Sequence, residues 1–343
     1  MDPRMQAFFE KRPELKERVA RSMFRTRLLL ASKPSVKARF VGYDHELFHH
    51  ALRDNCNKNG RELHSLMHLQ HILNAMRALG RQPGGEILEI GAGRAGLPIL
   101  LLLCGFDRIH INEMTNVVNC FQNAHAETLQ VLASIMGVAR RRLEDIVVPV
   151  DAHHCAIRPG MLRLHAFTDA AALDIAPGTL SAVISFTVLE HLRDPHAVFR
   201  HLRSCLAPDG WMCHLVDLRD HEDFTDPLRF LTVPAAQYRN LRGEWCNRLR
   251  HSDFLALFRS TGFEICAARV TRFNELDERR STDFWKMLVD GLQQVYRDDL
   301  PPHEVWVTDD MVARLHPEYR RYARADLSIL QSEYVLRAAI AGS

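Results

Sequence analysis

The 343-residue sequence lacks several features that would place it outside a reducing, aqueous compartment. None of its eight cysteines forms a Cys-x-x-Cys pair, which argues against a zinc ribbon and a disulfide framework. The longest apolar run, Leu97–Cys104, is far shorter than the ~20 residues of a membrane helix. Residues Met1–Lys16 mix both charge signs and lack the apolar core of a secretory signal. We therefore expect a soluble, cytoplasmic protein.

A strong charge imbalance is also missing. The formal net charge is +2, which gives no global reason to expect nucleic acid or a membrane as partner. One stretch, 11–40, is basic, with ten Lys and Arg residues against two Glu residues. A solvated helix that covers a pocket is favoured there over a nucleic-acid contact. The hydrophobic content of 47% is sufficient for a sizeable core.

Predicted strands and helices alternate from residue 86 onward, which indicates a parallel sheet with helices on both faces. The predicted strands are 86–90, 108–112, 161–166, 181–186, 211–217 and 263–270. The predicted helices are 95–104, 116–137, 195–206 and 252–260. An apolar segment, Leu327–Ala338, is expected to join the sheet as its last strand. The predicted fold class is therefore α/β, with a Rossmann-like, mostly parallel sheet of seven strands.

The expected domain organisation has two parts. Residues 1–80 lack a strand pattern, and Glu62–Leu79 carries apolar residues at helical spacing. We expect 1–80 to form a helical lid that covers the substrate, and 81–343 to form the α/β domain. Three insertions, expected to be helical for the most part, interrupt this domain at 139–160, 219–250 and 275–325.

A glycine-rich turn is the most informative local motif. A short apolar strand runs into Gly91, Gly93 and Gly96 before a helix start, which is an arrangement that brings a ligand close to bare backbone N–H groups. Glu113 lies 22 residues after Gly91, close to the ~20 expected of a carboxylate that binds ribose hydroxyls. Glu89 before the glycines suits an ammonium group, and no Lys or Arg directly follows the second strand to meet a phosphate. A ligand with an adenosine and a zwitterionic amino acid, S-adenosyl-L-methionine, fits these features better than a dinucleotide.

Three further motifs follow in order: Phe167–Ala170, Val188–Pro195 and Leu206–Gly210. Together with the glycine turn and Glu113, they make the chain resemble class I S-adenosylmethionine-dependent methyltransferases. The branch it is most similar to contains small-molecule and ubiquinone-pathway enzymes (methyltransferase type 11). The resemblance covers roughly residues 85–270 and the last strand. Two departures are Ser181, where the family usually has an acid, and the longer gap between Glu113 and Asp169.

The resemblance implies a cofactor site for S-adenosyl-L-methionine, with S-adenosyl-L-homocysteine as the product. Its residues would be Glu89, Gly91, Ala92, Gly93, Gly96, Glu113, Asp169, Ala170, Phe186 and Thr187. Glu89 and the glycine turn would hold the methionine end, and Glu113 would accept from both ribose hydroxyls. Asp169 would accept from the adenine amino group. Phe186 and Thr187 would line the cofactor wall, with Glu190 and His191 at the mouth of the site.

Methyl transfer from a sulfonium is a direct displacement, and an alcohol acceptor also needs a base. Such groups lie beyond the carboxyl ends of the strands in open α/β sheets. The candidates there are His191, Asp217 and His221, although hydrogen-bonded structural roles fit the two histidines equally well. No metal is expected, because residues 214 and 217 point to opposite faces of a strand and adjacent histidines such as 153 and 154 diverge.

The substrate class is inferred from the 219–250 insertion, which is rich in aromatic and arginine residues. Trp245, Arg248 and Arg250 are the candidate substrate contacts, and they suit a small polar or anionic metabolite such as a sugar or biosynthetic intermediate. The alternative is that these arginines only neutralise nearby acids. Methylation of oxygen is favoured over nitrogen or carbon.

Two other functions stay open. One is an RNA or protein methyltransferase that uses the basic 11–40 stretch, although no RNA-binding module is recognisable. The other is a cofactor-binding scaffold or regulatory subunit that needs a partner. The expected partners are thus a small-molecule substrate and, as one option, a second copy of the chain in a homodimer. No membrane contact is expected, and nucleic acid is disfavoured.

Overall fold

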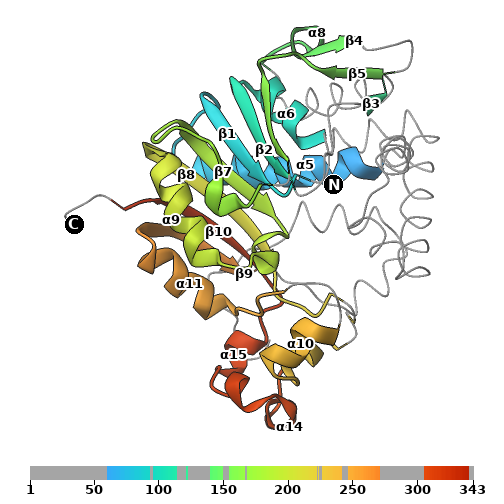
Figure 1. Cartoon of the computed structure of the whole chain (residues 1–343), viewed down its shortest axis with the longest axis vertical. Coiled ribbons are helices and arrows are strands. Elements are labelled where there is room, and N and C mark those ends of the chain that lie inside the picture. Colours follow the sequence, from blue (N-terminus) through green and yellow to red (C-terminus); the bar gives the residue numbers. More distant parts are fainter. Residues whose placement is uncertain are drawn as a thin grey trace. The chain divides into compact units, whose positions relative to one another are not determined.

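The computed structural model describes residues 60–92, 96–113, 121–122, 140–149, 154–166, 168–221, 223, 226–241, 246–270 and 305–339 (Figure 1). Residues 1–59, nearly all of the predicted helix 116–137 and much of the 275–325 insertion lie outside this part of the chain. The chain divides into two compact units. The first contains Met1–Thr168 and Ser281–Gln293, and the second contains Asp169–Arg280 and Gln294–Ser343.

Seven strands form one mixed sheet in the order β6-β2-β1-β7-β8-β10-β9. Their bounds are β1 Glu86–Ile90, β2 Arg108–Glu113, β6 Leu162–Ala166, β7 Leu180–Phe186, β8 Leu206–Asp217, β9 Phe263–Val270 and β10 Gln331–Ala338. The pairs β1–β2, β2–β6 and β7–β8 are parallel, whereas β10 runs antiparallel to both β8 and β9. The predicted Rossmann-like fold class is confirmed, including the last strand inside the sheet.

The first unit combines β1, β2 and β6 with two helices, α5 (Gly60–Ala78) and α6 (Gly96–Cys104). Every residue of α6 after Gly96 is buried, as expected for an apolar helix that packs on a sheet. Helix α5 contacts α6 and buries an apolar stripe that includes Leu69, Ile72 and Met76. The described end of the segment expected to act as a lid is therefore packed into the core of this unit.

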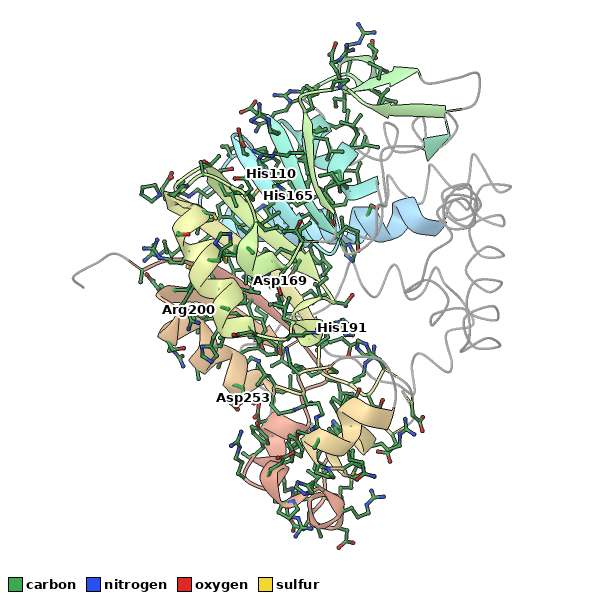
Figure 2. The ribbon with its side chains drawn as sticks, viewed as in Figure 1. His110, His165, Asp169, His191, Arg200 and Asp253 are labelled. Carbon is green, nitrogen blue, oxygen red and sulfur yellow. The ribbon has the colours of Figure 1, made fainter. Side chains whose placement is uncertain are left out.

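A buried polar chain links the three strands of the first unit. The Nε2 atom of His110 lies 2.7 Å from a carboxylate oxygen of Glu86, and its Nδ1 lies 3.1 Å from Nε2 of His165. The two imidazole rings are stacked with their centroids 5.4 Å apart (Figure 2). Burial lowers the pKa of His110 from its ordinary value. These polar groups satisfy one another inside the sheet.

The 139–160 insertion contains a second sheet, where mostly helical structure was expected. Its elements are α8 Leu143–Ile146, β4 Val147–Pro149 and β5 His154–Ile157, and β3 (Phe121–Gln122) completes the antiparallel order β3-β5-β4. The main-chain N–H groups of Arg140 and Arg141 donate to the carbonyl oxygen of Leu103. The Arg141 guanidinium donates to the Phe106 carbonyl and to Asp107. These contacts anchor the insertion at the end of α6.

The second unit combines β7, β8, β9 and β10 with α9 (Pro195–Cys205) and α11 (His251–Ser260). Helix α9 begins as its sequence predicts: Pro195 occupies the first turn, and the Asp194 carboxylate accepts from the Ala197 N–H at 2.9 Å. Phe199 and Phe258, from the two helices, pack edge to face with ring centroids 5.0 Å apart. Aromatic packing thus holds the two helices together.

A smaller core joins the two later insertions. The described elements are α10 Ala235–Leu241, α14 Asp309–Arg314, α15 Arg324–Leu327 and the 3-10 turns η3 Arg229–Leu231 and η5 Pro317–Tyr319. The buried side chains are Leu228, Phe230, Leu231, Tyr238, Val307, Leu315, Tyr319 and Leu327. Residues more than 60 positions apart in the sequence thus share one apolar cluster. No helix in the described ranges is both long and apolar enough to cross a membrane.

Candidate active site

In the first unit, the chain leaves β1 through a tight turn at Gly91. This glycine has a φ of +66°, which a residue with a side chain adopts only at a cost, and its N–H donates to the Asn112 carbonyl at 2.7 Å. Ala92 is half-buried beside it, and Gly96 begins α6. Gly93 lies outside the described residues. The turn therefore has the strand-to-helix geometry that the sequence predicts.

Two carboxylates lie near the carboxyl ends of β1 and β2 in the same unit. Glu89 on β1 is 4% exposed, and its Oε2 atom has no hydrogen-bond partner. Burial and the negative charge of Glu113, the last residue of β2, raise the pKa of Glu89 well above its ordinary value. Asn112 donates from Nδ2 to the Thr168 carbonyl at 2.8 Å and so fixes the chain beyond β6. The pair can accept hydrogen bonds from a cationic or hydroxyl-bearing ligand.

In the second unit, Asp169 and Ala170 form the start of a short 3-10 turn, η1 (Ala170–Ala172). The exposed Asp169 carboxylate, labelled in Figure 2, accepts from the Ala171 N–H at 2.9 Å, and Ala170 is buried. One Asp169 oxygen is thus engaged in capping the turn. A carboxylate has a second oxygen with which to accept from another donor.

The chain is strained where it leaves β7. Phe186 ends the strand and is buried, whereas Thr187 is exposed and has a φ of +54°. A β-branched residue rarely adopts this conformation, and such strain gathers at functional sites. The Thr187 N–H donates to the Leu215 carbonyl at 2.7 Å, which ties the strained residue to β8. The turn directs the chain into η2 (Leu189–His191), which carries two further polar side chains.

Four polar side chains, which we call the Glu190 cluster, meet beyond β7 and β8: Glu190, His191, Asp217 and His221. The Nε2 atom of His221 lies 3.9 Å from Oε1 of Glu190 and 3.8 Å from Oδ2 of Asp217. The ring of His221 meets the ring of His191 edge to face, with centroids 4.9 Å apart. All three residues expected to supply catalytic groups are therefore in one cluster, and Glu190 is its fourth member.

The electrostatics of the cluster are dominated by two buried carboxylates. Arg219 donates to both oxygens of Asp217, at 3.0 and 2.8 Å, and forms a buried ion pair. Glu190 is 2% exposed, and neither of its oxygens has a hydrogen-bond partner. Burial, followed by the charge of Asp217, raises the pKa of Glu190 well above its ordinary value. The cluster can therefore accept positive charge.

Asn247 holds the η2 turn in place, although sequence reasoning gave this residue no role. Its main-chain N–H donates to the Glu190 carbonyl at 2.7 Å, and its side-chain Nδ2 donates to the Leu189 carbonyl at 2.7 Å. Arg219 was missed as well. The close spacing of Asp217 and Arg219 is a usable signal for their ion pair, but nothing local marks Asn247 as a partner of a turn 58 residues away.

The residues expected to contact the substrate have different environments in the structure. Trp245 lies outside the described residues. Arg250 is 0% exposed, and its guanidinium donates to the carbonyls of Leu218, Leu327 and Ile329 at 2.6, 3.2 and 2.5 Å. The structure thus gives Arg250 a scaffolding role in place of the substrate contact expected from the sequence, because no ligand can reach a side chain enclosed in this way.

Arg248 lines a cavity of about 460 Å³ within the second unit. Its guanidinium lies between the rings of Tyr238 and Tyr319, 4.9 Å from each centroid, and donates to the Phe230 and Val233 carbonyls. Asn247 and Arg193 line the same cavity. Arg248 is itself only 4% exposed, and its Nη2 atom lies 3.7 Å from a carboxylate oxygen of Glu318. Of the predicted substrate residues in the described ranges, Arg248 is the one found among the residues that line this cavity.

A family model described as a methyltransferase domain matches residues 63–268. Among solved structures, the chain is similar to the YcgJ protein from Bacillus subtilis, with 14% identity, a TM-score of 0.36, and coverage of 78% of this chain and 97% of that one. It is also similar to phosphoethanolamine N-methyltransferase 2 from Haemonchus contortus, with 16% identity, a TM-score of 0.40, and coverage of 79% and 52%. A third is geranyl diphosphate C-methyltransferase from Streptomyces coelicolor A3(2), with 11% identity, a TM-score of 0.39, and 78% of each chain covered. No curated protein matches the sequence.

Proposed function

This chain belongs to the S-adenosylmethionine-dependent methyltransferases, and from that premise we propose that it methylates a hydroxyl oxygen of a small polar or anionic metabolite. The observation that carries the proposal is the Glu190 cluster. It brings imidazoles and carboxylates together beyond the carboxyl ends of β7 and β8, where reacting groups lie in open α/β sheets. An alcohol acceptor needs a base of this kind in order to become a nucleophile.

The residues of the first unit fit the cofactor. The Oε2 atom of Glu89 is a buried acceptor without a partner, which suits the ammonium group of the methionine end. Glu113 would accept from the ribose hydroxyls, and we assign the adenine amino group to the second oxygen of Asp169. When bound, S-adenosylmethionine supplies a methyl group on a sulfonium, which an acceptor oxygen takes as the carbon–sulfur bond breaks.

His221 is the proposed base. A neutral imidazole nitrogen can accept the proton that the acceptor hydroxyl loses as its oxygen attacks the methyl carbon. Asp217, 3.8 Å from Nε2 of His221, would stabilise the imidazolium that results. The Nε and Nη2 atoms of Arg219 donate to the two oxygens of Asp217, which fixes the position of its charge. His191 packs against the base and limits the movement of its ring.

Arg248 supports the proposed substrate class. It is among the residues that line the cavity, together with Tyr238, Tyr319 and Asn247, so the wall combines polar groups with aromatic side chains, while the charge of Arg248 is itself paired with Glu318. That combination favours a small molecule with a polar or anionic group over a purely apolar one. We assign the non-reacting part of the substrate to this cavity.

The test is a two-stage assay on the purified full-length chain. Calorimetric titration measures the binding of S-adenosylmethionine and S-adenosylhomocysteine, and transfer of labelled methyl groups is then measured with hydroxylated sugars and phenolic acids. We expect His221→Gln to lower kcat by about 10²–10⁴-fold with cofactor affinity unchanged. The matched control is His201→Gln on α9, whose ring contacts the Leu173 carbonyl, and it should keep kcat.

Other outcomes would contradict the proposal. Transfer only to RNA, with a steep dependence on salt, would favour a nucleic-acid methyltransferase. Methyl transfer to a protein would show instead that the chain is a protein methyltransferase. An absence of cofactor binding that is reversed by a copurifying second chain would favour a partner-dependent subunit.

A further inference from the structure

The Glu190 cluster also has the composition of a metal site. One ligand atom from each of Glu190, His191 and His221 lies within 4.8 Å of the other two. Two imidazoles and one carboxylate form a donor set that holds zinc in catalytic sites and iron(II) in oxygenases, with other coordination positions left open. The sequence predicts His191 and His221 to be catalytic candidates but predicts no metal, because other groups of residues are considered there as ligands.

The distances suit a single ion after a small adjustment. Bonds from zinc to nitrogen or oxygen are about 2.0–2.2 Å, so at the tetrahedral angle two ligand atoms on one ion lie about 3.4 Å apart. The 3.9 Å between Oε1 of Glu190 and Nε2 of His221 is close to that separation. The upper bound of 4.8 Å on the remaining pairs requires a closure of at most about 1.4 Å, which changes of side-chain torsion can supply.

The burial of Glu190 is an independent observation that points to a ligand. The side chain is 2% exposed, and both of its oxygens lack a hydrogen-bond partner. A buried ionised carboxylate is costly unless a cation or hydrogen-bond donors compensate for it. Arg219, the nearby arginine, is engaged with both oxygens of Asp217. The charge of Arg219 offsets only part of this cost, so a cation between Glu190 and the imidazoles would supply further compensation, and the partly exposed histidines leave a route of entry.

We propose that Glu190, His191 and His221 bind one divalent transition-metal ion. The inference rests on the proposed function, since it keeps methylation of a hydroxyl oxygen at the same cluster, but it gives His221 the role of a metal ligand in place of the role of base. With the ion bound, His221 is a ligand, and the acceptor hydroxyl occupies an open position on the ion. A metal lowers the pKa of a bound hydroxyl, so the proton passes to water and the oxygen attacks the methyl carbon as an alkoxide. Asp217 keeps its ion pair with Arg219 and does not coordinate the metal.

The test measures metal binding without any methyl transfer. The full-length protein is stripped with a chelator, dialysed, and titrated with Co²⁺ and Zn²⁺, using the visible absorption of Co²⁺ and mass spectrometry of bound metal. We expect one tight equivalent of either ion and much weaker binding of Mg²⁺, which prefers oxygen ligands. Glu190→Gln and His221→Ala should each lower Co²⁺ affinity by more than about 100-fold, since the loss of even an outer partner costs about 10- to 100-fold.

Two further variants keep the inference falsifiable. His201→Gln should bind Co²⁺ as the parent does, and Glu190→Asp, which keeps a shorter carboxylate, should fall between the parent and Glu190→Gln. Circular dichroism and S-adenosylmethionine binding identify any variant that fails to fold. Tight binding that survives both Glu190→Gln and His221→Ala would place the metal elsewhere and overturn the inference, as would the absence of a tight equivalent.

The two hypotheses fail in different ways. Methyl transfer that proceeds at full rate in chelator, with His221→Gln still inactive, would refute the metal and leave the proposed base intact. One tight equivalent of Co²⁺ together with transfer to no hydroxylated small molecule would support the metal site and refute the proposed substrate.

Discussion

Replacing Arg250 with methionine removes a guanidinium that joins three separate stretches of the second unit. It donates to the carbonyl of Leu218 after β8, and to those of Leu327 and Ile329 before β10. Hydrogen bonds from a charged donor are each worth about 1.5–3 kcal/mol, and orphaned buried carbonyls add a desolvation cost. Removal of a buried charge with its solvation cost offsets part of this loss. We therefore expect Arg250→Met to destabilise the unit by about 4 kcal/mol.

Urea denaturation followed by circular dichroism measures this loss, and Arg259→Met on the exposed face of α11 is the matched control. The control should change the free energy of unfolding by less than about 0.5 kcal/mol. At low temperature, where folded Arg250→Met still predominates, its KM for the methyl acceptor should equal that of the parent. A variant with parental stability but a strongly raised KM would refute the scaffolding role and restore Arg250 as a substrate contact.

Two further predictions concern the cofactor and the pH. Glu113→Ala should weaken S-adenosylmethionine binding by about 2 kcal/mol or more, roughly 30-fold, because a charged acceptor of ribose hydroxyls is lost; unchanged affinity in calorimetry would show that the site is misassigned. Burial lowers the pKa of His214 to about 3, so the unfolded chain, in which the pKa is near 6.5, binds the proton first. Stability should therefore fall by about 2 kcal/mol between pH 7.5 and pH 5 on this account, and His214→Phe should remove that part of the slope in urea titrations.

The sequence predicted the sheet well because its strands obey local rules. The apolar runs of β1 and β7 are buried on both faces, and strands of this kind can be predicted from the local sequence alone. The cap at Asp194 and the break at Gly262 are local as well, and they mark the start of α9 and the end of α11 correctly, although α11 begins at His251, one residue before Ser252, where the sequence predicts its start. The strands of the 139–160 insertion could not be predicted in this way, since they are only three and four residues long. Such short segments have too few residues for a period of two to be distinguished.

The roles of Arg248 and Arg250 could not be predicted from the sequence, because their hydrogen-bond partners are main-chain carbonyls far away along the chain. Arg250 and Arg248 are two residues apart and chemically identical, and both are buried, but of the two only Arg248 is among the residues that line the cavity. Their partners are backbone groups of Leu218, Ile329 and Phe230, which carry no mark in the sequence. Composition showed that the insertion is rich in arginine, but it could not show that both guanidinium groups donate to main-chain carbonyls.

Three residues on which the functional assignment rests break local rules of burial or backbone conformation; Arg248, with a φ of +60°, is another residue that does so. Glu89 and Glu190 bury carboxylate oxygens without hydrogen bonds, and Thr187 adopts a left-handed conformation. Each lies at or just beyond the carboxyl end of a parallel strand. Arg250 is buried as deeply, and although its Nε atom lacks a partner, its terminal nitrogens donate at least three hydrogen bonds. The proposed ligands would bring a cation to each of the two carboxylates, which would explain why these buried acids are tolerated.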